Sequence, residues 1–139
     1  MTKRKGFTLV ELMVVVLIVG VLAAVAIPLL TGRISQARWS EACAGAGTIR
    51  TAVRTYFAEN PTAAQALSGK MNVAATQNAL GITTTDLTGT YFVPGDYNID
   101  SVSATGMAAI TVTGSNAAVS GTSYTMSAAG VWSKNSSGG

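Results

Sequence analysis

The chain opens with Lys3-Arg4-Lys5-Gly6-Phe7-Thr8-Leu9-Val10-Glu11 and runs directly into an apolar stretch from Leu12 to Leu30. From residue 12 to residue 32 there are 21 residues without a formal charge. At ~1.5 Å per residue a helix of this stretch is about 31 Å long. That length matches the roughly 30 Å hydrocarbon core of a bilayer. The stretch therefore predicts a membrane-spanning helix.

Two residues of this helix do not suit a plain anchor. Glu11 places a carboxylate among apolar residues, and such a charge costs about 2.5–3.5 kcal/mol at the centre of a bilayer. Pro28 removes one backbone hydrogen bond and clashes with the preceding turn, at a cost of ~3 kcal/mol or more. A cut between Gly6 and Phe7 would create an α-amine close to Glu11, and an amine and a carboxylate buried together are tolerated where either alone is not. In a polymer such a pair sets the register between neighbours; the alternative is an unpaired carboxylate at the membrane surface.

Charge is concentrated at the N-terminus. The net charge of +3 comes from nine cations and six anions, and three of the cations are Lys3, Arg4 and Lys5. The remaining chain is neutral, which gives no support to nucleic-acid binding. The basic leader should stay in the cytoplasm while the residues after the span are exported. A secretory signal peptide cleaved at the small residues Ala24 and Ala26 is an alternative, but helical patterning continues well beyond that point.

The segment Gly6-Phe7-Thr8-Leu9-Val10-Glu11-Leu12, after a short basic leader and before an apolar helix with Pro28, resembles the class III signal of type IV pilins and type II secretion pseudopilins. The resemblance covers residues 1 to about 59. It implies that residues 1–6 are a leader cut after Gly6 by prepilin peptidase, that the new amine of Phe7 is methylated, and that Glu11 is the assembly carboxylate. It also implies that the helix between Gly20 and Pro28 can lose helicity in a filament; the alternative, for the isolated subunit, is a mild kink in an intact helix.

The resemblance also implies an α+β fold, the type IV pilin fold, in which a long N-terminal helix packs on a small antiparallel sheet. The residues support that organisation. The transmembrane and polymerisation segment (7–32) is followed by an amphipathic half of the same helix (33–59), in which Gly45 and Gly47 mark a bend or a close contact. The apolar positions of this half follow spacings of three and four and should form one buried face: Trp39, Ala42, Ala46, Ile49, Val53 and Tyr56.

Asn60-Pro61 should end the long helix, because proline restricts the residue before it. A connecting region (60–89) follows, with a short helix predicted from Asn72 to Leu80 and a stop at Gly81. From residue 90 to 139 the pattern favours a sheet and a C-terminal tail at 136–139. The predicted strands are Thr90–Val93, Tyr97–Ser103, Ala108–Thr113, Ser123–Ser127 and Val131–Lys134.

Enzymatic chemistry has little material in this sequence, since it contains no histidine and no glycine-rich phosphate loop. We expect no enzyme and no cofactor. Asp96 and Asp100, with Asp86, are weak candidates for calcium, which prefers several oxygen ligands. Many pilins close the C-terminal region with a disulfide; the single Cys43 makes that impossible here.

Three further side chains invite a functional interpretation. Cys43 is expected to be a packed thiol, with an intersubunit disulfide or a lipid site as alternatives. Arg50 and Arg54, on one helix face, are expected to be solvated or to pair with another subunit rather than with nucleic acid.

Together these features predict the structural subunit of a type IV pilus, most readily a major pilin. Its precursor would lie in the inner (cytoplasmic) membrane with the N-terminus in the cytoplasm, and the processed chain would form a surface filament. The implied partners are other copies of the chain, prepilin peptidase, an inner-membrane assembly platform with its ATPase, and a secretin where an outer membrane is present. The alternatives are a major pseudopilin of a type II secretion system and a signal-anchored binding module that does not polymerise.

Overall fold

The structure, a computed structural model, describes residues 6–119 and 122–135. Most of the predicted leader (1–5) and the predicted tail (136–139) lie outside these residues. The chain divides into two compact units, Met1–Gln36 and Ala37–Gly139, which are described separately below. Helix α1 (Leu9–Glu59) contributes to both units. It begins two residues after the start of the predicted segment 7–32 and ends at residue 59, where the predicted segment 33–59 ends.

In the first unit, α1 is helical throughout, including at Gly20 and Pro28. The helix is long and apolar enough to cross a membrane by length and composition, and its most apolar 18-residue window has no buried residue. The missing donor at Pro28 does not interrupt it. The carbonyl of Pro28 itself accepts the hydroxyl of Thr31 at 2.9 Å.

Asn60 and Pro61 end α1 as predicted, and Pro61 also begins a second short helix that was not predicted, α2 (Pro61–Gln65). Proline suits the first position of a helix, where its missing N–H is not needed. Helix α3 (Ala74–Leu80) confirms the predicted short helix, and Gly81 ends it in the left-handed conformation with φ of 64°. Two 3-10 turns follow, η1 (Thr84–Leu87) and η2 (Pro94–Asp96).

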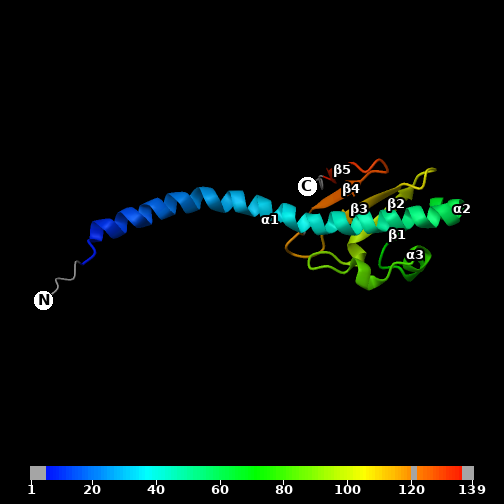
Figure 1. Cartoon of the computed structure of the whole chain (residues 1–139), viewed down its shortest axis with the longest axis horizontal. Coiled ribbons are helices and arrows are strands. Elements are labelled where there is room, and N and C mark those ends of the chain that lie inside the picture. Colours follow the sequence, from blue (N-terminus) through cyan, green and yellow to red (C-terminus); the bar gives the residue numbers. More distant parts are fainter. Residues whose placement is uncertain (1–5, 120–121, 136–139) are drawn as a thin grey trace. The chain divides into compact units, whose positions relative to one another are not determined.

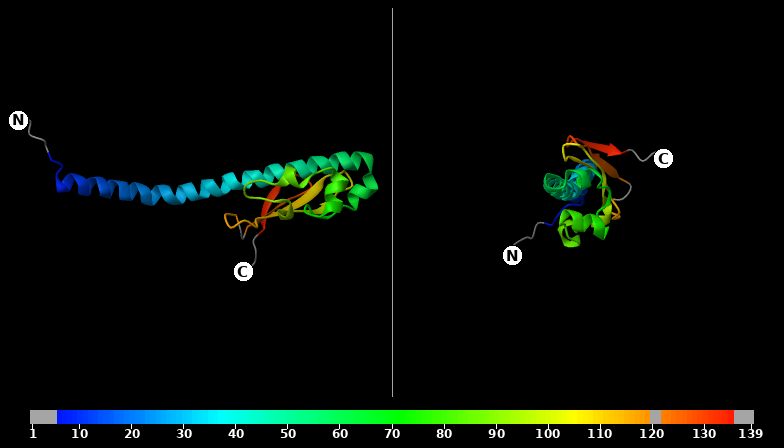
Figure 2. Two further views of the ribbon diagram at one scale, coloured as in Figure 1. Left: turned by 90° about the horizontal axis from the view of Figure 1, so that it is seen from below. Right: turned by 90° about the vertical axis from the view of Figure 1, so that its right-hand side faces the viewer.

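One antiparallel sheet with the order β1-β2-β3-β4-β5 completes the second unit. Its strands are β1 (Gly69–Lys70), β2 (Tyr97–Val102), β3 (Ala108–Thr113), β4 (Ser123–Met126) and β5 (Trp132–Asn135). It lies along the part of α1 that belongs to this unit (Figures 1 and 2). The α+β class and four of the five predicted strands are confirmed within one or two residues.

The core lies between this part of α1 and the sheet. Five of the six residues of the predicted apolar face are buried, and Tyr56 packs against the same cluster. Trp39 is its largest member on the helix. Its ring lies 5.0 Å from that of Phe92 and 4.4 Å from that of Tyr124, so it ties α1 both to the loop before η2 and to β4.

The predicted strand Thr90–Val93 is wrong. Its backbone amides do not join the sheet, because the carboxylate of Glu41 on α1 takes them. Thr90, Tyr91 and Phe92 donate to the two oxygens of Glu41 at 3.2, 2.9 and 2.9 Å. The segment is therefore a loop held against the helix. The edge strand next to β2 is the two-residue β1 instead.

The expectation that Arg50 is solvated is also wrong, and its pairing with another subunit stays a prediction. This guanidinium is partly buried and donates to the carbonyl of Ala128, between β4 and β5. Arg54, one helical turn further on, is exposed as expected. The difference arises because Arg50 lies at the border of the buried face, where a long side chain reaches the sheet.

Candidate functional site

The first turn of α1 holds a reciprocal cap between Thr8 and Glu11. The backbone N–H and the hydroxyl of Thr8 donate to Oε2 of Glu11 at 3.0 and 2.9 Å, and the N–H of Glu11 donates to the Thr8 hydroxyl oxygen at 3.3 Å. This is the capping-box arrangement, which satisfies donors that a helix N-terminus leaves open. The carboxylate is therefore positioned by its own helix.

Only one oxygen of that carboxylate is used. Within the part of the chain that the structure describes, Oε1 of Glu11 accepts no hydrogen bond. A second acceptor site thus remains open on a charged group among apolar side chains. It suits a cationic donor, since a charge-assisted hydrogen bond is the stronger kind.

Gly6 and Phe7, which precede the cap, are exposed to solvent. Phe7 is 81% exposed. A β-carbon added to Gly6 would meet no other atom within 4 Å, so no contact in the described chain requires glycine at that position. The predicted cleavage point is therefore accessible in the structure, and the requirement for glycine would have to come from another protein.

The apolar residues that follow have no covering partner in the described chain. Large hydrophobic side chains are exposed on all sides of the helix, a surface that soluble monomers rarely keep open. Those more than 60% exposed include Leu9, Val10, Met13, Val16, Leu17, Val21, Leu22, Val25, Ile27 and Leu29. Such a helix is suited to lipid, or to other helices of the same kind.

Gly20 and Pro28 are the two weak points of this helix. A β-carbon at Gly20 would meet nothing within 4 Å, so its glycine serves no close contact in the described residues. Proline at position 28 cannot donate to the carbonyl four residues earlier. The helix is nonetheless intact at both, and loss of helicity there on assembly stays a prediction.

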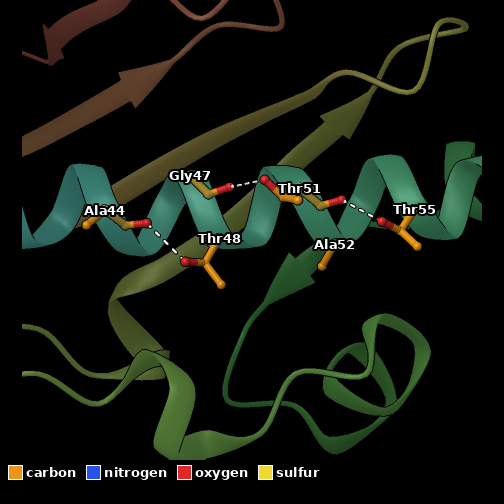
Figure 3. Close-up of a pocket in the computed structure, with 6 residues that line it drawn as sticks. All are labelled: Ala44, Gly47, Thr48, Thr51, Ala52 and Thr55. Atoms are coloured by element: carbon orange, nitrogen blue, oxygen red, sulfur yellow. Dashed lines mark hydrogen bonds between the residues drawn. The ribbon is translucent and has the colours of Figure 1, made fainter.

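In the second unit, the exposed side of α1 is lined by small residues. Figure 3 shows them around a shallow groove: Ala44, Gly47, Thr48, Thr51, Ala52 and Thr55. The hydroxyls of Thr48, Thr51 and Thr55 turn back to carbonyls one helical turn earlier, at 3.2, 3.0 and 3.2 Å. Because these hydrogen bonds are internal, the face is smooth and loses little hydrogen bonding when it is covered.

The expectation that Cys43 is a packed thiol is wrong, since the residue is exposed. It follows the buried Ala42 directly, and one step along a helix turns a side chain by about 100°, away from the apolar face. Partial desolvation raises the pKa of its thiol. The structure thus offers no activated thiolate at this position.

The weak calcium candidates do not form a group. Asp96 accepts the N–H of Val93, Asp86 accepts the N–H and hydroxyl of Thr83, and Asp100 accepts Asn98 and Thr111. Among residues 6–119 and 122–135, no three Asp, Glu, His or Cys side chains lie together where they could hold a metal ion.

The residue that sequence reasoning missed is Thr8. Its signal was present in the sequence, because a threonine three residues before a glutamate at the start of an apolar run is the pattern of a capping box. Glu11 was singled out for its charge alone. The structure adds the side chain that orients it.

The chain is similar to known proteins both in its N-terminal segment and over most of its length. A family model described as the prokaryotic N-terminal methylation motif matches residues 1–27. Fimbrial protein Q of Moraxella bovis is 34% identical over 140 residues, which cover 95% of this chain and 85% of that protein. The type IV major pilin protein PilE1 of Neisseria gonorrhoeae is 48% identical over 56 residues, 40% of this chain and 34% of the relative.

A type IV major fimbrial protein FimA of Dichelobacter nodosus is 34% identical over 112 residues, 78% of this chain. That match spans 61% of the FimA protein, so the chain covers less than two thirds of this relative's length. The shared identity with the Neisseria protein is higher over a shorter stretch.

Proposed function

Since this chain belongs to the type IV pilin family, we propose that it is the major structural subunit of a type IV pilus and polymerises through α1. The observation that carries the proposal is the apolar helix of the first unit, whose large hydrophobic side chains are exposed. The similarity to fimbrial protein Q over 95% of this chain supports the same function.

The precursor lies in the cytoplasmic membrane, with the basic residues before Gly6 on the cytoplasmic side. Prepilin peptidase cuts after Gly6, and the new α-amine of Phe7 is methylated. The accessible Gly6 and the exposed Phe7 support this step. A methylated amine keeps its positive charge, so it remains a partner for a carboxylate.

In the filament, the amine of Phe7 in one subunit pairs with Glu11 of a neighbour. The unused Oε1 of Glu11 supports this pairing, because the intrachain cap engages only Oε2. Burying both charges together avoids the cost of leaving either alone in an apolar surrounding. The pair therefore favours one axial register over others.

The rest of α1 gives the surface for packing. Apolar side chains of the first unit exchange lipid for the helices of other copies, and small residues such as those in Figure 3 allow close approach of helices. Local loss of helicity between Gly20 and Pro28 would let the helix adjust on transfer from membrane to filament. The function is structural, and no catalytic step is assigned to the chain.

The assembly partners follow from this cycle. They are prepilin peptidase, an inner-membrane platform with its ATPase, and a secretin where the cell has an outer membrane. Each is proposed from the processing motif and the membrane helix.

The test is to shear filaments from cells and to analyse the recovered protein by mass spectrometry. The account predicts this chain as the main component, beginning at a methylated Phe7. A chain that stays in the membrane fraction, with loss of protein export on deletion, would indicate a pseudopilin instead. An uncut N-terminus would indicate an anchored module and would contradict the proposal.

A further inference from the structure

Arg50 of α1 lies in an unusual surrounding for a cation. Its guanidinium donates to the carbonyl of Ala128, and its other contacts are two thioether sulfurs. Nη2 lies 3.6 Å from Sδ of Met107, and Nη1 lies 4.0 Å from Sδ of Met126. Among the described residues these are all of its hydrogen-bond partners, and none is a carboxylate.

The guanidinium lies between two turns of the sheet. Met107 follows the β2–β3 turn, where its N–H donates to the hydroxyl oxygen of Ser103 at 3.0 Å. Ala128 belongs to the β4–β5 turn, which ends at Gly130 with φ of 85°. A β-carbon at Gly130 would lie 2.6 Å from Nη1 of Arg50, so this turn is pressed against the cation. Arg50 thus holds both turns against α1.

The N–H groups of the Arg50 guanidinium have only one oxygen acceptor in this arrangement of the described residues. Guanidinium carries five N–H donors, and thioether sulfur is a weak acceptor. A charged donor gains most from an oxygen acceptor. An oxygen atom placed on the sulfur of Met107 would stand next to a cation that has spare donors.

Methionine can gain such an atom. Its oxidation to the sulfoxide turns an apolar side chain into a polar one, and in most cores this disrupts packing. Met107 differs from the other methionines of this unit in being only partly buried, whereas Met126 is 5% exposed and Met71 is fully buried. It is therefore both the most accessible of the three and, at 3.6 Å, the one whose sulfur lies nearest to the Arg50 guanidinium.

We propose that Met107 is an oxidation site for peroxides, and that Arg50 binds the resulting sulfoxide oxygen. In the reaction, the O–O bond of hydrogen peroxide breaks and one oxygen forms a bond to Sδ. The sulfur gives up two electrons, and the second oxygen leaves as water with both hydrogens. The product strengthens the contact between α1 and the two turns instead of opening the core. The inference concerns the fold of the second unit and is independent of filament formation.

The first measurement locates the oxygen. Full-length chain carrying Cys43→Ser, which removes thiol oxidation, is treated in detergent with hydrogen peroxide. Fragment-ion mass spectra then assign the added oxygen to Met71, Met107 or Met126, which share one tryptic peptide between Lys70 and Lys134. We expect Met107 to react first among the three. Oxidation of Met126 or Met71 ahead of Met107 would overturn the proposal.

The second measurement is the thermal midpoint of that chain before and after oxidation. One added charge-assisted hydrogen bond should raise Tm by about 4–8 °C in a domain of this size. With Arg50→Gln, which removes the charge, oxidation should lower Tm. An equal fall in Tm with and without Arg50 would mean that the cation does not bind the sulfoxide.

Should Arg50→Gln not fold, a matched pair at position 107 still decides. Met107→Gln places a carbonyl oxygen near the guanidinium without any oxidant, and Met107→Leu is the apolar control of similar size. The glutamine variant should melt above the leucine variant by a similar number of degrees. A glutamine variant that melts at or below the leucine variant would refute the proposed role of Arg50.

Discussion

The hydroxyl group of Tyr97 on β2 occupies the space that a β-carbon at Gly45 of α1 would need. The ring of Tyr97 fills the space beside position 45, so a side chain there would force that ring to move. Gly47 lies two residues further along the same helix, and a β-carbon there would meet nothing within 4 Å. The sequence alone does not distinguish the two glycines. The two glycines therefore form a matched pair for testing the packing of the second unit.

Gly45→Ala should destabilise the second unit by about 1–2 kcal/mol, because the cost of overpacking outweighs the gain in helix propensity. Gly47→Ala should stabilise it by about 0.5–1 kcal/mol. Denaturant unfolding followed by fluorescence of Trp39 and Trp132 measures both. Equal effects of the two substitutions would contradict the close approach, and Tyr97→Phe should relieve part of the cost at position 45.

The same tyrosine predicts a dependence on alkaline pH. Burial, and then the negative charges of Glu41 and Asp96, raise the pKa of Tyr97 above its ordinary value of 10.0. The phenol is thus neutral in the folded chain at pH values where the unfolded chain ionises it. Its stabilising contribution is complete below pH 10 and is lost as the pH rises above 10. Tyr97→Phe should flatten the fall in unfolding free energy above pH 10, and an unchanged slope would contradict this assignment.

Glu41 should be the main tie between α1 and the loop that carries Phe92. Glu41→Ala leaves three amides without their acceptor and should cost about 2–3 kcal/mol of unfolding free energy. Glu41→Gln keeps one acceptor oxygen and should cost clearly less. Hydrogen exchange of the Tyr91 and Phe92 amides should accelerate in the alanine variant, and protection at the wild-type level would show that the loop is held by other contacts.

The contacts of Glu41 show which part of the fold could not be predicted from the sequence. Helix α1, β3 and the apolar face around Ile49 were predictable because each rests on local periodicity. The residues from Thr90 to Val93 have a strand-like composition, yet Glu41, some 50 positions away, takes their amides. The position of Glu41 on the helix does not by itself predict its hydrogen bonds to these amides.

Contacts between residues far apart in the sequence also could not be predicted. Arg50 lies away from the centre of the apolar face, which predicts a solvated or intersubunit side chain, but its acceptor Ala128 lies 78 positions away. Cys43 is predicted to be a packed thiol because it lies in the helix and the chain has no histidine to activate it, yet the residue is exposed. At the N-terminus, by contrast, the chemistry of Glu11 follows from its apolar neighbours, and only the role of Thr8 required the structure.

Thr8 should matter through the orientation of Glu11. Thr8→Ala removes one of the two donors to Oε2 and the acceptor for the Glu11 N–H, a loss of about 0.5–2 kcal/mol for a helix cap. We expect several-fold fewer filaments at an unchanged level of membrane-bound chain. Thr8→Ser retains the hydroxyl and is the control. Filament numbers that are equal in the two variants would show that the cap has no part in assembly.

The charge of Glu11 should be required for assembly, which is measured by counting filaments in electron micrographs of cells that carry Glu11→Ala or Glu11→Gln. Immunoblots of the membrane fraction control for insertion and cleavage. We expect processed chain in the membrane of both variants and few or no filaments, since neither side chain can neutralise the amine of Phe7. Filaments of normal number and length from either variant would contradict it.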